Sequence, residues 1–128
     1  MKFGVLLNYN LCYIASPYTK YLHGIDQAYK DVCAVAAVLI THGVKVFAPI
    51  CHSHSIATHG NINPLNHNMW LAADEPMMDA ADALVIVKLD GWNESYGVDY
   101  EVDVFKAADK DIFYLNPNTM ELSLEHDQ

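Results

Sequence analysis

The chain has 128 residues, of which 52% are hydrophobic, so it has the length and apolar content for the core of one domain. Sixteen acidic residues against seven basic ones, all lysines, give a formal net charge of −9. This balance argues against binding to a nucleic-acid polymer or an anionic membrane, because both attract clustered cations.

The cysteines and the N-terminus both favour the cytoplasm. No two of Cys12, Cys33 and Cys51 have the Cys-x-x-Cys spacing, so we interpret them as free, buried thiols in a reducing compartment. The apolar run in residues 1–7 is too short for a signal peptide or a membrane span. We therefore expect a cytoplasmic protein.

The first predicted element is a short strand. Residues 11–15 form an apolar run that stops at Ser16 and Pro17, as expected where a strand enters a loop. Residues 3–7 are compatible with another strand or with an N-terminal extension.

A helix and a second strand follow. Apolar residues recur with helical spacing in residues 25–40, and Gly43 stands where a glycine often ends a helix. Residues 45–48 predict a strand that Pro49 stops. Residues 52–68, with four histidines, predict a long polar loop.

The central part predicts a helix and the clearest strand. Residues 69–81 have a helical pattern that Pro76 interrupts, which makes Asp74 a candidate N-cap of a fresh start. Residues 83–89 are a continuous apolar run, typical of a strand buried on both faces.

The last part predicts a loop over residues 91–97, a helix over 98–108 and a strand over 112–115. The polar residues 119–128 predict a flexible tail on a single domain that spans residues 1–128.

The alternation of strands and helices predicts an α/β fold. We expect a Rossmann-like, flavodoxin-like three-layer sandwich whose mostly parallel sheet has four or five strands. Ligands bind such sheets beyond the carboxyl ends of the strands. That rule places residues 13–18, 49–54 and 90–101 on one rim.

The strongest candidate site runs from Ser95 to Glu101, after the buried strand. Gly97 allows a tight turn, Ser95 offers a hydroxyl, and the start of the helix presents free N–H groups suited to an anion. Glu101 is expected in the first helical turn, facing the crevice. The alternative is that Ser95 only caps the helix and Glu101 only complements its dipole.

A second carboxyl could meet Glu101 at the same rim. Glycosyl chemistry needs one carboxyl beside the sugar and one that handles the proton of the leaving group. Asp74 precedes the valine-rich strand and is the candidate, although a helix cap explains it equally well. Asp79 and Asp82 are better explained as caps.

The run from Tyr13 to Tyr18 ends the first strand. Tyr13 could hold a carboxylate by a hydrogen bond, while Ser16 and Tyr18 in the following loop could cradle a sugar or a phosphate. An aromatic core residue followed by a proline turn is the alternative.

Four histidines stand in the predicted loop, namely His52, His54, His59 and His67. A His-x-His pair can bind zinc, but no cysteine or carboxylate stands at matching spacing. We therefore expect no metal, and we interpret the loop as a lid over the ligand or as a subunit contact.

Several motifs resemble the nucleoside 2-deoxyribosyltransferase-like superfamily. They are Tyr-Ile-Ala-Ser-Pro-Tyr at 13–18, the helix with Asp74 followed by Ala-Asp-Ala-Leu-Val-Ile-Val at 81–87, and Ser-x-Gly-x-x-x-Glu at 95–101. Pro-x-x-His-Ser-His at 49–54 and Asp-Gly-Trp at 90–92 are similar to an uncharacterised phage and bacterial branch of that superfamily.

This resemblance implies roles for four residues. Glu101 corresponds to the nucleophile, Asp74 to the acid that assists the leaving base, Tyr13 to the residue that orients the nucleophile, and Ser95 to the serine that binds the 5′ end.

The chain departs from the family at three places. Residues 16–20 replace an arginine-containing loop of the nucleotide-hydrolysing branch, which weakens the case for a monophosphate substrate. Asp-Gly-Trp precedes Ser95, which indicates a different base pocket. Pro76 follows Asp74, which puts the placement of Asp74 in doubt.

We therefore expect cleavage or transfer of the N-glycosidic bond of a nucleoside or nucleotide, with retention. Glu101 attacks C1′ while Asp74 protonates the departing base. Trp92, His52 and Tyr18 are expected to contact the base.

No cofactor is expected, and the expected partners are the small-molecule substrate and further copies of the chain in a homodimer or larger homo-oligomer. The sequence leaves open the base, the sugar, a 5′-phosphate, and water or a second base as acceptor. Two other functions stay possible on the sequence: a catalytically inactive nucleoside- or nucleotide-binding module, and a protein that interacts with a host or partner protein.

Overall fold

The computed structural model describes residues 1–124, which contain a five-stranded sheet in the order β2-β1-β3-β4-β5. The strands are β1 (Cys12–Ala15), β2 (Val46–Phe47), β3 (Ala83–Val87), β4 (Asp111–Leu115) and β5 (Leu122–Leu124). The first four pair in parallel, and β5 runs antiparallel to β4. The predicted Rossmann-like α/β fold with a mostly parallel sheet is confirmed.

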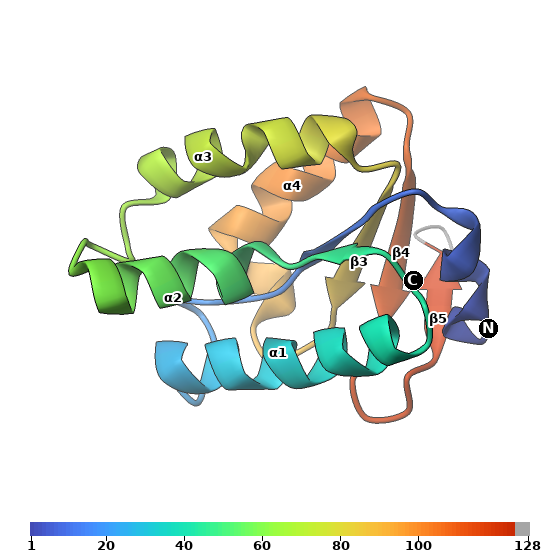
Figure 1. Ribbon diagram of the computed structural model, residues 1–128, viewed down its shortest axis with the longest axis horizontal. Coiled ribbons are helices and arrows are strands. Elements are labelled where there is room, and N and C mark those ends of the chain that lie inside the picture. Colours follow the sequence, from blue (N-terminus) through green and yellow to red (C-terminus); the bar gives the residue numbers. More distant parts are fainter. Residues whose placement is uncertain (125–128) are drawn as a thin grey trace.

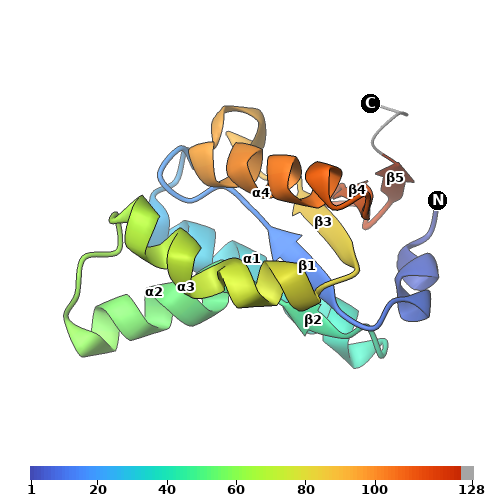
Figure 2. The ribbon, with the colours of Figure 1, turned by 90° about the horizontal axis from the view of Figure 1, so that it is seen from above.

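Helices lie on both sides of the sheet. They are α1 (Ile25–Thr41), α2 (Pro49–Gly60), α3 (His67–Ala80) and α4 (Tyr96–Ala107), with two short 3₁₀ helices, η1 (Phe3–Asn8) and η2 (Trp92–Glu94). Figure 1 shows α1 on one side of the strands and α3 on the other, and in Figure 2 α3 runs between α2 and α4. Within residues 1–124, no helix has the length and apolar content to cross a membrane.

Two cores form because successive residues of a strand point to opposite faces of the sheet. Ile14 of β1 packs in the core that α1 covers, whereas its neighbour Tyr13 packs with Phe105 of α4 in the other core. All five residues of β3 are buried, which explains its continuous apolar sequence. The alternation places Tyr13 on the face of the sheet that carries α4.

The prediction of a loop over residues 52–68 is wrong for most of its length, because residues 52–60 lie in α2 and residues 67–68 in α3, which leaves only residues 61–66 as a loop. Pro49 occupies the first turn of α2, where its missing N–H costs no hydrogen bond. Ile50, His54 and Ala57 are buried at spacings of four and three residues, which is a helical stripe. A histidine in the middle of that stripe hides the pattern in the sequence.

The predicted fresh helix start at Asp74 is also wrong. The side chain of Asn66 caps α3 by accepting a hydrogen bond from the N–H of Met69, at 3.3 Å. The helix continues from there through Pro76 to Ala80, so Asp74 lies inside it.

Both ends of the chain differ from expectation. Residues 3–7 lie in η1, which agrees with an N-terminal extension and not with a strand. Part of the predicted tail forms β5, because Leu122 is buried and pairs with Leu115 of β4. The amino group of Met1 donates to the carbonyl of Leu122 at 2.6 Å, so the N-terminus lies beside β5. The last four residues of the predicted tail lie outside the described residues.

The cysteines are free, but only Cys12 is buried. Cys33 of α1 and Cys51 of α2 are half-buried, and their Sγ atoms are 3.1 Å apart where the two helices pack together.

Candidate active site

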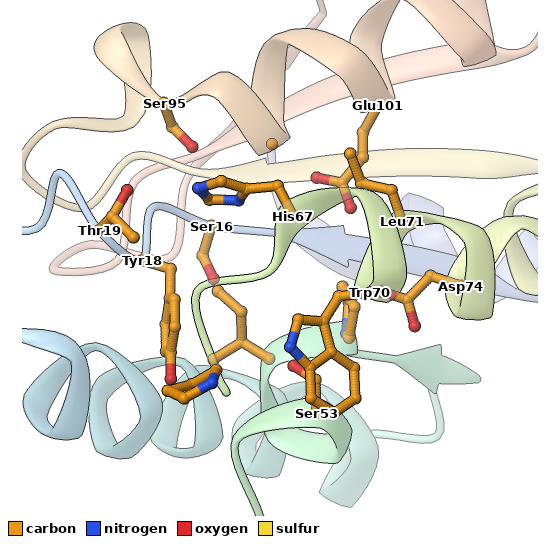
Figure 3. A pocket seen from close by; sticks show the side chains of 14 residues that line it. Ser16, Tyr18, Thr19, Ser53, His67, Trp70, Leu71, Asp74, Ser95 and Glu101 are labelled. Carbon is orange, nitrogen blue, oxygen red and sulfur yellow. The ribbon is translucent and has the colours of Figure 1, made fainter. Parts of the chain in front are cut away.

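A pocket opens beyond the carboxyl ends of β1, β2 and β3, where the sequence places a ligand (Figure 3). The loop after β1 contributes Ser16 and Tyr18, and the start of α2 contributes Ile50. The start of α4 contributes Gly97 and Glu101. All three segments predicted on the rim therefore meet at one pocket.

Glu101 lies in this pocket and is 5% exposed. The sequence predicted Glu101 in the first helical turn. Because α4 begins at Tyr96, Glu101 lies in the second turn instead. Figure 3 shows its carboxyl group pointing into the pocket. The pKa of Glu101 is raised to about 8, mainly by burial and also by the charge of Asp74, while the Tyr13 hydroxyl opposes this rise.

Asp74 faces the same pocket from α3 and is also 5% exposed. Burial raises the pKa of Asp74 to about 6, and the nearby His52 reduces that shift. The α-helical spacing of His67, Leu71 and Asp74 turns all three side chains toward the pocket. Asp74 therefore faces the pocket because it lies inside α3 and not at its start.

Tyr13 stands behind Glu101 and does not line the pocket. Its side chain is fully buried, with ring centroids 5.6 Å from Phe47 and 5.7 Å from Phe105. Burial raises the pKa of Tyr13, and the charges of Glu101 and Asp74 raise it further. The hydroxyl has no hydrogen-bond partner that meets the geometric criteria among residues 1–124, and it interacts electrostatically with Glu101.

The two carboxyls form a coupled acid–base pair. Their pKa values of about 6 and about 8 mean that the pair holds a single proton near neutral pH. No lysine lines the pocket within the described part of the chain, so Asp74 and Glu101 are not neutralised by a cation there.

The serines and Gly97 provide polar contacts at the pocket edge. Ser95 caps α4 by accepting a hydrogen bond from the N–H of Val98 at 3.3 Å, so the predicted cap is confirmed. The buried Ser16 hydroxyl lines the pocket and has no hydrogen-bond partner among residues 1–124. Together with the first N–H groups of α4, the Ser16 hydroxyl is suited to a polar ligand.

Of the three residues expected to contact a base, only Tyr18 lines the pocket. Trp92 lies in η2, where its ring packs edge-on against Tyr114 with centroids 5.4 Å apart. His52 is exposed on α2, 5.9 Å from the ring of Phe47, and acts on the pocket only through its charge interaction with Asp74.

Sequence reasoning missed Trp70, Leu71 and Thr19, which also line the pocket. His67, expected in a lid over the ligand, and Ser53, in the predicted rim segment 49–54, line it as well. A signal for Trp70 exists in the sequence, because His67, Trp70 and Asp74 follow a spacing of three and four residues on one helix face. The prediction of a loop up to residue 68 hides this pattern, because it separates His67 from the predicted helix.

The four histidines do not form one group. His54 is buried between α1 and α2, His67 lies in the pocket near the ring of Tyr96, and His59 is exposed at the end of α2. No group of three or more histidine, cysteine or acidic side chains within residues 1–124 could hold a metal ion.

Gly91 explains why the Asp-Gly-Trp run accompanies the Ser-Pro-Tyr run. Its φ is +91°, and a Cβ atom at this position would lie 2.3 Å from the carbonyl oxygen of Lys20. The loop before η2 therefore packs directly on the backbone of the loop that carries Ser16 and Tyr18. Only glycine allows this approach without displacement of that loop.

The fold and the pocket define an α/β domain with two buried carboxyls at the carboxyl edge of a parallel sheet. Residues 10–116 match a family model described as "Domain of unknown function (DUF1937)", and the chain belongs to that family. No curated protein matches the chain. Because the family description states no activity, the function is argued from the pocket.

Proposed function

We propose that this protein cleaves or exchanges the N-glycosidic bond of a nucleoside or nucleotide with retention. Glu101 attacks C1′ of the sugar, Asp74 protonates the departing base, and Tyr13 orients Glu101. The covalent sugar then passes to water or to a second base. The observation that supports this most is the pair of buried carboxyls, Glu101 and Asp74, in one pocket.

The proton on the pair sets the order of events. A nucleophile must be ionised, whereas burial raises the pKa of Glu101 and so favours its protonated form. The proton therefore moves from Glu101 to Asp74 when substrate binds. This leaves a carboxylate beside C1′ and an acid beside the base, and the Tyr13 hydroxyl stabilises the new charge on Glu101.

The polar edge of the pocket is proposed to hold the sugar. The unpaired Ser16 hydroxyl and the N–H groups at the start of α4 are placed to receive sugar hydroxyls or the 5′ end.

Several apolar side chains between Ile56 and Met69 are exposed. The homo-oligomer expected from the sequence stays a prediction.

Base release by Glu101 and Asp74 variants tests this proposal. The protein is incubated with a panel of nucleosides, deoxynucleosides and their 5′-monophosphates, and free base is measured by chromatography. Glu101→Gln is expected to lower base release by at least about a thousandfold, because it removes the nucleophile. Asp103→Asn, an exposed acid on the same helix, is the matched control.

Trapping the intermediate identifies the nucleophile. After an acid quench during turnover, peptide mass spectrometry is expected to find the sugar on the peptide that contains Glu101. A sugar attached to Asp74 would reverse the two roles. Full base release by Glu101→Gln would disprove the attack by Glu101.

A nucleoside-binding module without catalysis is the second candidate. It is favoured by the burial of Glu101, because burial raises the pKa of this carboxyl, and a neutral carboxyl binds hydroxyls but does not attack carbon. Thermal stabilisation by a nucleoside without release of base would support this candidate.

A further inference from the structure

His54 lies behind the pocket lining and contacts one of the lining residues, Tyr18. It does not line the pocket, yet it is only 7% exposed between α1 and α2. Its Nδ1 atom is 2.6 Å from the hydroxyl of Tyr18, which does line the pocket. Its Nε2 atom is 3.1 Å from Oδ1 of Asp26, whose side chain is 86% exposed.

The position of Asp26 favours one direction for the hydrogen bond between His54 and Tyr18. The Asp26 carboxylate lies 3.1 Å from Nε2 of His54 and can only accept, so it favours the neutral tautomer with the proton on Nε2. In the neutral imidazole, Nδ1 is then an acceptor. The hydroxyl of Tyr18 therefore donates its proton to Nδ1, and only acceptor lone pairs of that oxygen are left for a ligand.

Stacking holds the imidazole in this orientation. The ring of Tyr29 stacks on His54 with centroids 4.5 Å apart and planes at 25°, while the ring of Tyr18 meets it edge-on at 5.7 Å. The Tyr29 hydroxyl in turn accepts a hydrogen bond from Ser55 at 3.0 Å. His54 thus ties the Tyr18 loop to α1 and α2.

The second aromatic wall of the pocket also has no free donor. Nε1 of Trp70 donates to the carbonyl of Asn63 at 3.0 Å. Figure 3 shows the rings of Tyr18 and Trp70 on different sides of the pocket. A planar ligand between these walls finds an acceptor at Tyr18, whereas its own acceptors find no donor on either ring.

We propose that His54 is a positioning residue that makes Tyr18 select ligands carrying a hydrogen-bond donor. Resting on the proposed function, this means that the pocket prefers amino-bearing bases over the matched keto bases. Asp26 fixes the tautomer of His54, and His54 fixes the polarity of the Tyr18 oxygen. This assigns a common purpose to the Ser-Pro-Tyr and His-Ser-His runs.

Binding of matched ligands tests the proposal without turnover. In a Glu101→Gln background, calorimetry compares 2′-deoxyadenosine with 2′-deoxyinosine and 2′-deoxycytidine with 2′-deoxyuridine. The amino member of at least one pair is expected to bind about five- to tenfold more tightly, which is the contribution of one hydrogen bond.

Two variants should remove this preference. His54→Phe keeps a ring against Tyr29 but cannot accept from Tyr18, and Tyr18→Phe removes the oxygen itself. Because both changes act on one hydrogen bond, the double variant is expected to show no further loss. His54→Gln, whose amide oxygen accepts from Tyr18, is expected to keep most of the preference, and Asp103→Asn is the control.

The outcomes separate the two proposals. Nucleoside binding with no amino preference, or a preference that survives both phenylalanine variants, overturns this inference and leaves the proposed function standing. The same conclusion follows if Glu101→Gln abolishes base release while all four ligands bind equally. No binding of any of the four nucleosides overturns this inference, and the proposed function is then decided by the base-release panel, which includes the 5′-monophosphates. If His54→Phe does not fold, Tyr18→Phe alone decides.

Discussion

The two sides of the pocket are built differently. The inner wall is the start of α4, where Glu101 lies one turn before Phe105, a fully buried residue that packs on the fully buried Tyr13. The outer wall is α3, in which only Asp74 and Met78 are buried. One carboxyl is thus placed by the core, and the other by a helix that rests on few buried contacts.

This difference indicates a division of labour. A nucleophile must keep one position, and packing against the sheet supplies the rigidity. A wall with exposed residues on most of its length can shift to admit a ligand, because few buried contacts oppose its movement. Trp70 and His67 on the outer wall are therefore suited to recognition of the base.

The largest expected contrast is in stability. Phe105→Ala is expected to lower the free energy of unfolding by about 3–5 kcal/mol, because it leaves a cavity beside Tyr13. Leu71→Ala on the half-buried face of α3 is expected to cost less than about 1.5 kcal/mol. Chemical denaturation measures both values, and equal losses would contradict the proposed difference between the walls.

Gly91 tests how firmly the loop before η2, which leads to the inner wall, is attached to the loop that carries Tyr18. Gly91→Ala is expected to cost more than about 2 kcal/mol, because the φ of +91° is strained for alanine and the new methyl group meets the carbonyl of Lys20. Gly97→Ala is the matched control, since its nearest atom is Oγ of Ser95 at 3.9 Å. Inside a helix this change is expected to stabilise by up to about 1 kcal/mol.

Either outcome is read from thermal unfolding. If Gly91→Ala is as stable as Gly97→Ala, the loop before η2 does not depend on the close approach to Lys20, and the coupling between the two loops is absent.

The sequence predicted the inner wall much better than the outer one. The valine-rich strand, the Ser95 cap and the presence of Glu101 on the following helix come from local patterns, because a buried strand and a capped helix have strong sequence signals. The outer wall also has a cap, Asn66, but the sequence around it is misleading. The buried His54 interrupts the apolar stripe of α2, and Pro76 suggests a break that does not occur in α3.

The sequence also does not predict which side chains contact each other. Nothing local shows that Tyr18 bonds to His54, or that Trp92 packs on Tyr114 and stays out of the pocket. Such contacts join segments distant in the chain, so they depend on the completed fold. The rule that ligands bind beyond the carboxyl ends of parallel strands places Glu101 at the pocket, whereas Asp74 reaches the pocket from inside α3, which this rule does not cover.

The two carboxyls should differ in how they couple stability to pH. The folded-state pKa of Glu101 is raised from 4.5 to about 8, so the folded protein binds this proton more tightly than the unfolded chain. The wild type therefore loses stability as the pH rises from about 4.5 to 8. Glu101→Gln removes that loss and is expected to be more stable by about 1–3 kcal/mol at pH 9, with no gain near pH 4.

Asp74→Asn provides the comparison for the outer wall. Its smaller shift, from 3.8 to about 6, confines the pH-dependent loss to a narrower window, so a smaller gain is expected. Denaturation at several pH values measures both variants. A larger gain for Asp74→Asn than for Glu101→Gln would show that burial raises the pKa of Asp74 more than that of Glu101.

The pH dependence of base release is the mildest test, at about tenfold per pH unit outside the optimum. Catalysis needs one proton shared by Glu101 and Asp74. Below about pH 6 both carboxyls are protonated and no nucleophile is present, whereas above about pH 8 both are ionised and no acid remains. We expect a bell-shaped profile of kcat/KM with limbs near these values.

The variants assign the limbs to the walls. Asp74→Asn leaves a single titrating carboxyl, so its residual activity should increase with pH as Glu101 ionises and should not fall again at high pH. A profile that keeps its alkaline limb in this variant would mean that the acid is a different group. The outer wall would then contribute recognition alone, and the inner wall would contain the whole of the chemistry.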